Sequence, residues 1–307
     1  MVKILVVGDF HGKLPKNFLK KIKKENPGII LSPGDYCGNQ QLAKLFFKYV
    51  HKKDEDEISE SIKNKIDSLE IKSLVDGLKV LEKIVSLKAD FYGVRGNWDP
   101  LNYEFDIGSE DKKHKEFGLR RFNRKFKNKK LKDIGFKVVE LRDFILVGGG
   151  SSTSPGKINK VTLNKVYEES ENKKEAKKLI KLRIKNYKKR ERKYTKLFEK
   201  ATKLKEKTKK PIIFLTHNCP HRTRVDKITS KKAPKKLRGK HYGSYLEKQI
   251  IKKYNPDLVL CGHMHEGFGK SKTGKSKVVN SGSALNKEYV VFEVKGNKVK
   301  NIKLKRA

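Results

Sequence analysis

Five short apolar runs, each followed directly by a polar loop, constrain the fold of this chain more than any other feature. They are Lys3–Val7, Ile29–Leu31, Phe91–Arg95, Ile212–Leu215 and Leu258–Cys261. Runs of this length, alternating with stretches of helical periodicity, are typical of buried strands in α/β folds. Because the carboxyl ends of parallel strands meet at one edge of a sheet, we expect the chemistry of the protein at the ends of these runs.

Two longer stretches have the periodicity of helices. Residues 42–88 carry apolar side chains at helical spacing, interrupted by a charged segment at 52–60. Residues 157–210 contain neither Gly nor Pro, and their apolar residues share one face, which predicts one long amphipathic helix or two in a hairpin. The lysine-rich outer face of this segment has three interpretations: a solvated surface on a packed helix, a nucleic-acid arm or a docking surface for a partner.

The organisation expected from these elements is a single domain. We find no internal repeat and no linker-like segment, so residues 1–307 are predicted to form one domain with a helical insertion at about 157–210. No apolar stretch approaches the roughly 18 residues that a membrane span requires. We see no signal peptide, and three cysteines provide no disulfide framework. These features predict a cytoplasmic protein without a membrane association.

The charge of the chain is extreme. Its 76 Lys and Arg against 35 Asp and Glu give a net charge of +41, and only 12 of the basic residues are Arg. One interpretation is a polyanionic partner such as RNA or DNA, held through counterion release. The other is a compositional preference for lysine, because recognition of phosphates or bases in a forked geometry would favour Arg. The charge therefore identifies no substrate by itself.

Residue types that bind metal ions follow all five apolar runs. Taken singly, an Asp after a strand is often a cap, and a lone His is often a structural residue. The combination is more specific, because it includes two close pairs, Asp9 with His11 and His263 with His265. Each pair can direct both of its side chains to one site from the same short loop. The seven candidate metal ligands are Asp9, His11, Asp35, Asn97, His217, His263 and His265.

The donor types favour a pair of divalent cations. Carboxylate, imidazole and amide groups together suit borderline ions better than Ca²⁺ or a structural zinc held by cysteines. One carboxylate would bridge two such ions, which would lower the pKa of a bridging water and bind the phosphoryl oxygens during an in-line displacement. Of the divalent ions, we expect Mn²⁺ to occupy the site, with Fe, Zn, Mg or Ni as alternatives.

Five sequence blocks carry a resemblance to a known family. In order they are Gly8-Asp9-Phe10-His11-Gly12, Gly34-Asp35, Gly96-Asn97-Trp98-Asp99, Thr216-His217 and Gly262-His263-Met264-His265. They resemble the signature blocks of the calcineurin-like metallophosphoesterases, and the chain looks most similar to the Icc-related phosphoesterases. Supporting features include the loop Gly148–Pro155, with Ser151 and Ser152. The resemblance implies a four-layer αββα sandwich around a two-metal site.

The resemblance also implies a role for each ligand. Asp9, His11 and His265 would hold the first metal, and Asn97, His217 and His263 would hold the second. Asp35 would bridge the two. Asp35, Asn97 and His217 are accordingly the predicted catalytic residues.

The third block departs from the family pattern. Its commonest form has a His where this chain has Trp98, and that His is thought to protonate the leaving group. An indole donates a hydrogen bond but cannot act as a general acid near neutral pH. Leaving groups of low pKa need less protonation, so Trp98 favours phosphodiesters or activated esters over alkyl monoesters. With an aromatic residue at this position, the chain also resembles scaffold members of the family that have largely lost catalysis.

The predicted function is a binuclear metal-dependent phosphoesterase that prefers phosphodiesters. The alternatives are a catalytically weak scaffold or nucleic-acid-binding protein on the same fold, and a nuclease. Arg222, Arg224 and His221 follow the fourth block and are candidate substrate-binding residues, with His221 a possible substitute for the missing acid.

Overall fold

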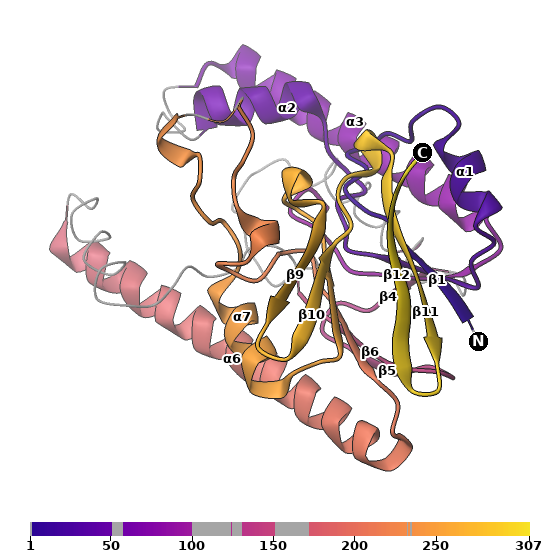
Figure 1. Cartoon of the computed structure of the whole chain (residues 1–307). Helices are drawn as coiled ribbons and strands as arrows, with labels where there is room; N and C mark the ends of the chain where they lie inside the picture. Colours follow the sequence, from indigo (N-terminus) through magenta and orange to yellow (C-terminus); the bar gives the residue numbers. More distant parts are fainter. Residues whose placement is uncertain are drawn as a thin grey trace.

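Two six-stranded sheets form the centre of the molecule (Figure 1). The computed structural model describes residues 2–50, 58–99, 124, 131–150, 172–231, 233 and 235–307. The first sheet has the order β12-β11-β1-β2-β3-β4, and the second has the order β5-β6-β7-β8-β10-β9. β1 to β4 pair in parallel in the first sheet, as do β6, β7, β8 and β10 in the second.

The elements have the following bounds. The strands are β1 Val2–Val6, β2 Ile29–Ser32, β3 Asp90–Gly93, β4 Leu131–Asp133, β5 Val138–Glu140, β6 Ile145–Gly148, β7 Ile212–Leu215, β8 Leu258–Cys261, β9 Gly269–Thr273, β10 Ser276–Asn280, β11 Glu288–Lys295 and β12 Lys298–Arg306. The α-helices are α1 Phe18–Lys24, α2 Gln40–Leu45, α3 Glu60–Val85, α6 Lys173–Thr208 and α7 Tyr245–Tyr254. A π-helical turn, η1 Phe46–Val50, continues α2, and short 3-10 turns are η3 Arg224–Asp226, η4 Lys235–Leu237, η5 His265–Gly267 and η6 Ala284–Asn286.

Each central strand is buried on both faces, and its alternate side chains enter two different cores. In β1, Leu5 packs in the core that includes residues of α1 and α3, whereas its neighbour Ile4 packs between the two sheets. In β7, Phe214 packs with residues of α6 and α7, whereas Leu215 joins the core between the sheets. The layers are therefore helix, sheet, sheet and helix, which confirms the predicted αββα sandwich.

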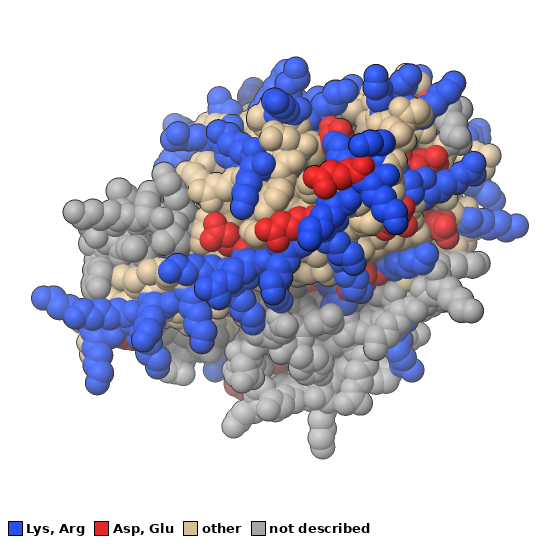
Figure 2. Space-filling view, turned by 90° about the horizontal axis from the view of Figure 1, so that it is seen from below, with Lys and Arg blue, Asp and Glu red and all other residues tan. Residues whose placement is uncertain are grey.

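Helix α6 accounts for most of the predicted helical insertion. The Asn172 side chain accepts a hydrogen bond from Lys174 N at 2.8 Å at the start of the helix. The helix ends where Lys209 adopts a left-handed conformation (φ 59°), two residues before Pro211. Within the described part of the insertion, α6 is one continuous helix of 36 residues. Lys and Arg cover much of the face seen in Figure 2, which views the molecule from the side of α6.

Two strands do not correspond to any apolar run in the sequence. β4 has three residues and pairs only with β3, and β9 (Gly-Lys-Ser-Lys-Thr) is a polar edge strand that pairs only with β10. β4 is too short to show an apolar period, and every residue of β9 is glycine or polar. Several predicted features lie outside the described residues: Ser151, Ser152 and Pro155 of the Gly-rich loop, and residues 157–171 of the insertion.

Of the helices within the described ranges, none combines the length and the apolar character that a bilayer-spanning segment requires.

Candidate metal centre

The seven candidate ligands follow five strands that are divided between the two sheets. Asp9 and His11 follow β1, Asp35 follows β2 and Asn97 follows β3, all in the first sheet. In the second sheet, His217 follows β7, and His263 and His265 follow β8. The strand ends thus converge between two facing sheets, rather than at the edge of one.

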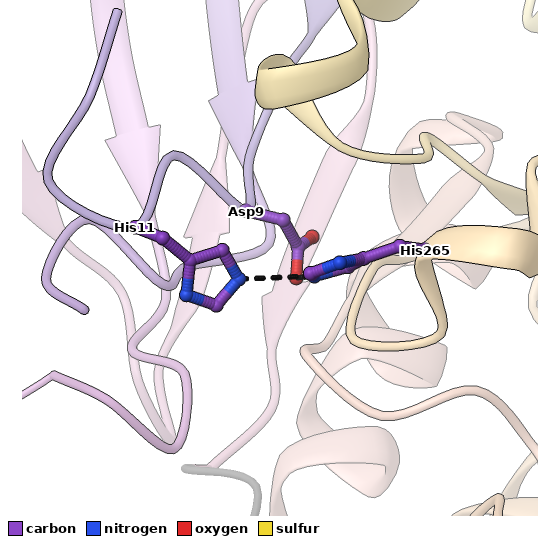
Figure 3. Close-up of side chains that lie close together, drawn as sticks. All are labelled: Asp9, His11 and His265. Atoms are coloured by element: carbon purple, nitrogen blue, oxygen red, sulfur yellow. Dashed lines mark hydrogen bonds and ion pairs between the residues drawn. The ribbon is translucent and has the colours of Figure 1, made fainter. Parts of the chain in front are cut away.

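Asp9, His11 and His265 form a first group of side chains (Figure 3). His11 Nε2 lies 2.9 Å from His265 Nε2, and His265 Nε2 lies 3.3 Å from Asp9 Oδ1. Asp9 is buried, and both histidines are partly buried. One potential ligand atom of each residue lies within 4.8 Å of the others, a spacing that a single cation could span.

Asp35, His217 and His263 form a second group, and Asn97 joins it. His217 Nε2 lies 3.2 Å from His263 Nδ1 and 3.4 Å from Asp35 Oδ2. Asn97 Oδ1 lies 3.0 Å from His217 Nε2 and 3.1 Å from His263 Nδ1. Four potential donor atoms therefore point to one place.

Asp35 faces both groups with the same oxygen. Its Oδ2 lies 3.4 Å from His217 Nε2 and 3.8 Å from His11 Nε2. The other oxygen, Oδ1, accepts a hydrogen bond from the backbone N–H of Trp98 at 2.9 Å. The geometry is that of a carboxylate held in place on one side and free to be shared by two cations on the other.

The loops that carry the ligands are held in unusual backbone conformations. Asp9 (φ 53°), His11 (φ 45°), Asp35 (φ 54°) and His263 (φ 65°) all lie in the left-handed region. Such conformations are disfavoured for residues with a Cβ atom, and they cluster at functional sites. The surrounding structure must therefore compensate for this strain.

Two glycines of the sequence blocks let the chain approach the ligand carboxylates closely. A Cβ atom on Gly96 would lie 2.0 Å from Asp35 Oδ1, and one on Gly262 would lie 2.1 Å from Asp9 Oδ2. These contacts are shorter than any van der Waals separation. The glycines of the third and fifth blocks are thus required by packing against the ligands.

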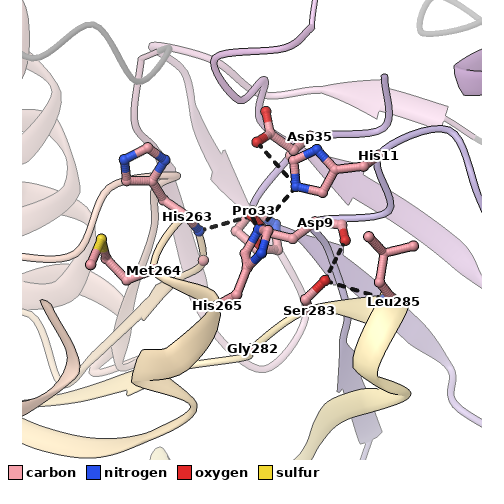
Figure 4. Close-up of polar contacts among 12 residues, drawn as sticks. Asp9, His11, Pro33, Asp35, His263, Met264, His265, Gly282, Ser283 and Leu285 are labelled. Carbon is pink, nitrogen blue, oxygen red and sulfur yellow. Dashed lines mark hydrogen bonds and ion pairs between the residues drawn. The ribbon is translucent and has the colours of Figure 1, made fainter. Parts of the chain in front are cut away.

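A second layer of hydrogen bonds orients the ligands (Figure 4). The Pro33 carbonyl lies 2.9 Å from His217 Nδ1, so His217 donates from Nδ1 and presents the lone pair of Nε2 to the site. The backbone N–H of His263 donates to Asp9 Oδ1 at 3.0 Å, and the Ser283 hydroxyl donates to the Asp9 carbonyl at 2.8 Å.

Asp99 fixes the loop that holds Asp35. Its Oδ2 accepts hydrogen bonds from the backbone N–H groups of Asp35 at 2.7 Å and Gly96 at 2.8 Å, and its Oδ1 accepts from that of Cys37 at 2.9 Å. The structure identifies the backbone that it holds.

The ligand histidines differ in their electrostatics. Burial lowers the pKa of His11 to about 4 and that of His263 to about 3. For His265, burial lowers the pKa, but the hydrogen bond to Asp9 and the nearby carboxylates outweigh it and leave the pKa raised. Burial, with the nearby charges of Asp99 and Asp9, raises the pKa of Asp35 well above its usual range. For Asp9, burial raises the pKa, but the hydrogen bond from His265 and the neighbouring histidines outweigh it and leave the pKa lowered.

These residues fit divalent cations. Asp9 Oδ2 is buried and has no hydrogen-bond partner among the described residues. The neutral imidazoles of His11 and His263 expose lone pairs where several ligand atoms meet. A cation would offset the mutual repulsion of the buried carboxylates. Because the donors are oxygen and nitrogen atoms, the set suits borderline divalent ions.

The three candidate substrate-binding residues lie on the loop after His217. The His221 ring packs on the Tyr245 ring at 3.7 Å between centroids, and its Nδ1 lies 3.7 Å from Asp226 Oδ2. Arg222 and Arg224 have exposed side chains. Within the described part of the chain, no hydrogen bond, ion pair or ring contact joins these three residues to the seven candidate ligands.

Asp226 organises this loop, a role that the sequence did not assign to it although Thr223 and Asp226 after the fourth block support the family resemblance. Asp226 is fully buried and accepts hydrogen bonds from the backbone N–H groups of Arg222, Thr223 and Gly243. His241 Nδ1 lies 2.8 Å from Asp226 Oδ1. The only signal in the sequence is the capping-box spacing of Thr223 and Asp226, which is too common to identify such a centre.

Comparisons with known proteins agree with this geometry. The family model described as "Calcineurin-like phosphoesterase" matches residues 2–267, a span that includes all seven candidate ligands. No functionally curated protein matches the chain in sequence.

Two solved structures align with nearly the whole chain. One crystal structure of an unspecified protein aligns with a TM-score of 0.58 at 16% identity, over 99% of this chain and 98% of that chain. The crystal structure of TT1561 of Thermus thermophilus covers the same shares at 15% identity, with a TM-score of 0.48. At 16% identity, the first of these similarities shows a common fold.

Proposed function

The chain belongs to the calcineurin-like phosphoesterase family, and from this membership we propose that it is a two-metal hydrolase that cleaves phosphodiesters in preference to phosphomonoesters. The family itself implies a metal-dependent phosphoester hydrolase. The observation that carries the two-metal proposal is the position of Asp35 Oδ2, 3.4 Å from His217 Nε2 and 3.8 Å from His11 Nε2. A carboxylate so placed is suited to being shared by two cations.

Each side chain has a proposed role. Asp9, His11 and His265 would hold one ion, Asn97, His217 and His263 would hold the other, and Asp35 would lie between them. When bound, the ions supply an activated water as nucleophile and stabilise negative charge on the phosphoryl group. The chain keeps His11 and His263 neutral by burial and fixes His217 through Pro33. We propose Mn²⁺ as the first ion to test.

The preference for diesters rests on Trp98. Its indole ring lies edge-on to His11, with the ring centroids 6.4 Å apart, so it borders the proposed site. An indole N–H does not release a proton near neutral pH, so an alkoxide of high pKa would leave slowly. Diesters with better leaving groups need no such acid. His221 is a poor replacement, since its ring is buried against Tyr245.

Arg222 and Arg224 are the proposed contacts to the substrate. Both side chains are exposed on the loop that follows His217, where a guanidinium could pair with a phosphate oxygen. Replacing either with Gln should raise KM and leave kcat nearly unchanged if the contact is made equally to substrate and transition state.

A direct assay tests the function. The Mn²⁺-loaded protein should hydrolyse bis(p-nitrophenyl) phosphate with a higher kcat/KM than p-nitrophenyl phosphate, and chelation should remove both activities. A higher kcat/KM for the monoester would reject the diester preference. No turnover of either substrate by protein that contains two ions would reject the enzymatic proposal.

The second candidate is a binding protein with little catalysis, which Trp98 and the net charge of +41 favour. It predicts full metal occupancy without turnover. A nuclease is a variant of the first candidate, and degradation of RNA or DNA in the same assay would identify it.

A further inference from the structure

One face of helix α6 is an unbroken line of basic side chains. Every position along this line, at steps of three or four residues, is Lys or Arg, and all are exposed. We call this set the α6 stripe, and it consists of positions 174, 178, 181, 185, 189, 192, 196, 200, 203 and 207. At 1.5 Å per residue, it is roughly 50 Å long.

The basic composition of the chain does not explain the stripe. Helix α3 has five Lys residues and five Asp or Glu residues, whereas α6 has 17 Lys or Arg residues and only four Glu residues. The stripe also contains like charges four residues apart, for example Lys181 and Lys185, and such pairs destabilise a helix. The sequence therefore concentrates positive charge on α6 at a cost in stability.

The stripe extends toward the side of the molecule where the candidate metal ligands lie. Tyr194 of α6 accepts a hydrogen bond from the backbone N–H of Gly150, just after β6, at 3.1 Å, and donates to Glu247 at 2.8 Å. Glu247 in turn accepts from Thr216, which directly precedes His217, at 2.9 Å. Tyr194 is therefore level with the carboxyl ends of β6 and β7. The N-terminal part of α6 projects past the sheets from there (Figure 1).

We propose that the α6 stripe binds the phosphate backbone of nucleic acid without regard to sequence. A straight line of closely spaced cations complements a linear polyanion with regularly spaced phosphates. All stripe residues except Arg192 are Lys, which supply point charges rather than the forked donors used to read bases. The binding is a property separate from hydrolysis, although its location would bring phosphodiesters to the metal side of the sandwich.

Other anionic surfaces fit the stripe less well. A helix that lies on a membrane buries its apolar face in lipid, but most of the apolar face of α6, including Tyr194 and Phe198, is packed in the protein core. Its exposed large apolar side chains within the described residues are two, Leu179 and Leu182, which are too few to anchor a helix in lipid. A protein interface normally has an apolar or aromatic centre, and the stripe has none. Nucleic acid is the macromolecule that needs only the charge.

Fluorescence anisotropy with labelled oligonucleotides of mixed sequence tests the proposal on the full chain. The test variant combines Lys178→Gln, Lys181→Gln and Lys185→Gln, and the matched control combines Lys65→Gln, Lys72→Gln and Lys83→Gln on α3. All six side chains are exposed, and both variants lose the same charge. Single-stranded RNA, single-stranded DNA and duplex DNA are titrated across a range of salt concentrations.

We expect the stripe variant to bind about tenfold more weakly at moderate salt, and the slope of log K against log salt to fall by about 2 to 3. The α3 control should bind like the wild type. An equal loss in both variants would show that net charge, not the stripe, is responsible, and would overturn the proposal. So would the absence of binding at low ionic strength, or binding to anionic phospholipid vesicles without binding to oligonucleotides.

Discussion

The indole Nε1 of Trp98 lies 3.1 Å from the Asn97 side-chain amide, whose other polar atom faces His217 and His263. If Asn97 presents Oδ1 to the histidines, as a metal ligand would, its NH₂ group meets the indole N–H, and two donors cannot bond. If the amide is turned over, Oδ1 accepts from Trp98, and the NH₂ group donates to His217 and His263. Trp98 thus opposes the orientation in which Asn97 can bind a metal.

Replacing Trp98 with Phe should therefore tighten metal binding at the second group of ligands. Trp98→Phe removes the N–H donor and keeps an aromatic ring, so Asn97 can direct Oδ1 to the ion without leaving a donor opposed. We expect the weaker of two Mn²⁺ dissociation constants to fall by roughly tenfold, as measured by isothermal titration calorimetry.

Phe46→Leu is the matched control for this change. The Phe46 ring lies edge-on to Trp98 at 6.3 Å between centroids and has no polar atom. Its replacement therefore alters the packing around Trp98 but leaves the indole N–H in place. Equal tightening in both variants would mean that looser packing, and not the indole N–H, controls the affinity.

Trp98→His should shift the substrate preference from phosphodiesters toward phosphomonoesters. An imidazole at this position, bordering His11, could donate a proton to the leaving group, which an indole cannot. We expect the ratio of monoester to diester kcat/KM to rise by about 10²-fold, the lower range for general acid catalysis. An unchanged ratio, with metal content equal to the wild type, would remove Trp98 as the basis of the diester preference.

Asp35→Asn should have opposite effects on the metal-free and metal-loaded protein. Burial and the neighbouring carboxylates raise the pKa of Asp35, so its charged form is disfavoured in the folded apo protein. Asn also tolerates the left-handed conformation at this position. We expect the apo variant to unfold at a higher urea concentration than the apo wild type. Added Mn²⁺ should stabilise the wild type strongly and the variant weakly.

Turnover and metal content check the same variant. The activity of Asp35→Asn should fall by about a hundredfold or more, and its metal content by elemental analysis should drop below that of the wild type. Wild-type activity in Asp35→Asn would refute the proposed sharing of this carboxylate, whatever the urea curves show.

Most of the fold could be predicted from the sequence because its central strands are apolar on both faces. Runs such as Ile212–Leu215 and Leu258–Cys261 have no alternation, and they occupy buried positions where both faces pack. β9 was missed because its residues are polar and its pairing is through backbone atoms alone. The sequence could not distinguish one continuous helix α6 from two helices in a hairpin, because the spacing of the apolar residues is the same in both.

The candidate ligands could be predicted because the chemistry of a metal site demands particular side chains. Their partners could not, since many are backbone groups: the Pro33 carbonyl that orients His217 has no sequence signal. The same holds for the distribution of ligand strands over two sheets, and for the contact of Trp98 with Asn97. These relationships depend on packing between segments that are distant in the chain.

The last prediction concerns Glu247, which joins α6 to the strand that carries His217. Burial raises its pKa to about 7 from 4.5, although hydrogen bonds from Tyr194 and Thr216 act to lower it. Between these two values the folded protein binds more protons than the unfolded chain, so the free energy of unfolding falls as pH rises. The loss should reach about 3 kcal/mol by pH 8.

Glu247→Gln removes this titration and keeps an oxygen to accept from Tyr194 and Thr216. The difference in unfolding free energy between variant and wild type should therefore shift by about 3 kcal/mol in favour of the variant from pH 5 to pH 8, as measured by urea denaturation. Glu199→Gln, at an exposed position on α6, serves as the control and should show no such shift. A constant difference between Glu247→Gln and wild type across this range would mean that the Glu247 carboxyl ionises in the folded protein near its ordinary pKa, because Arg190 or an internal water stabilises its charge.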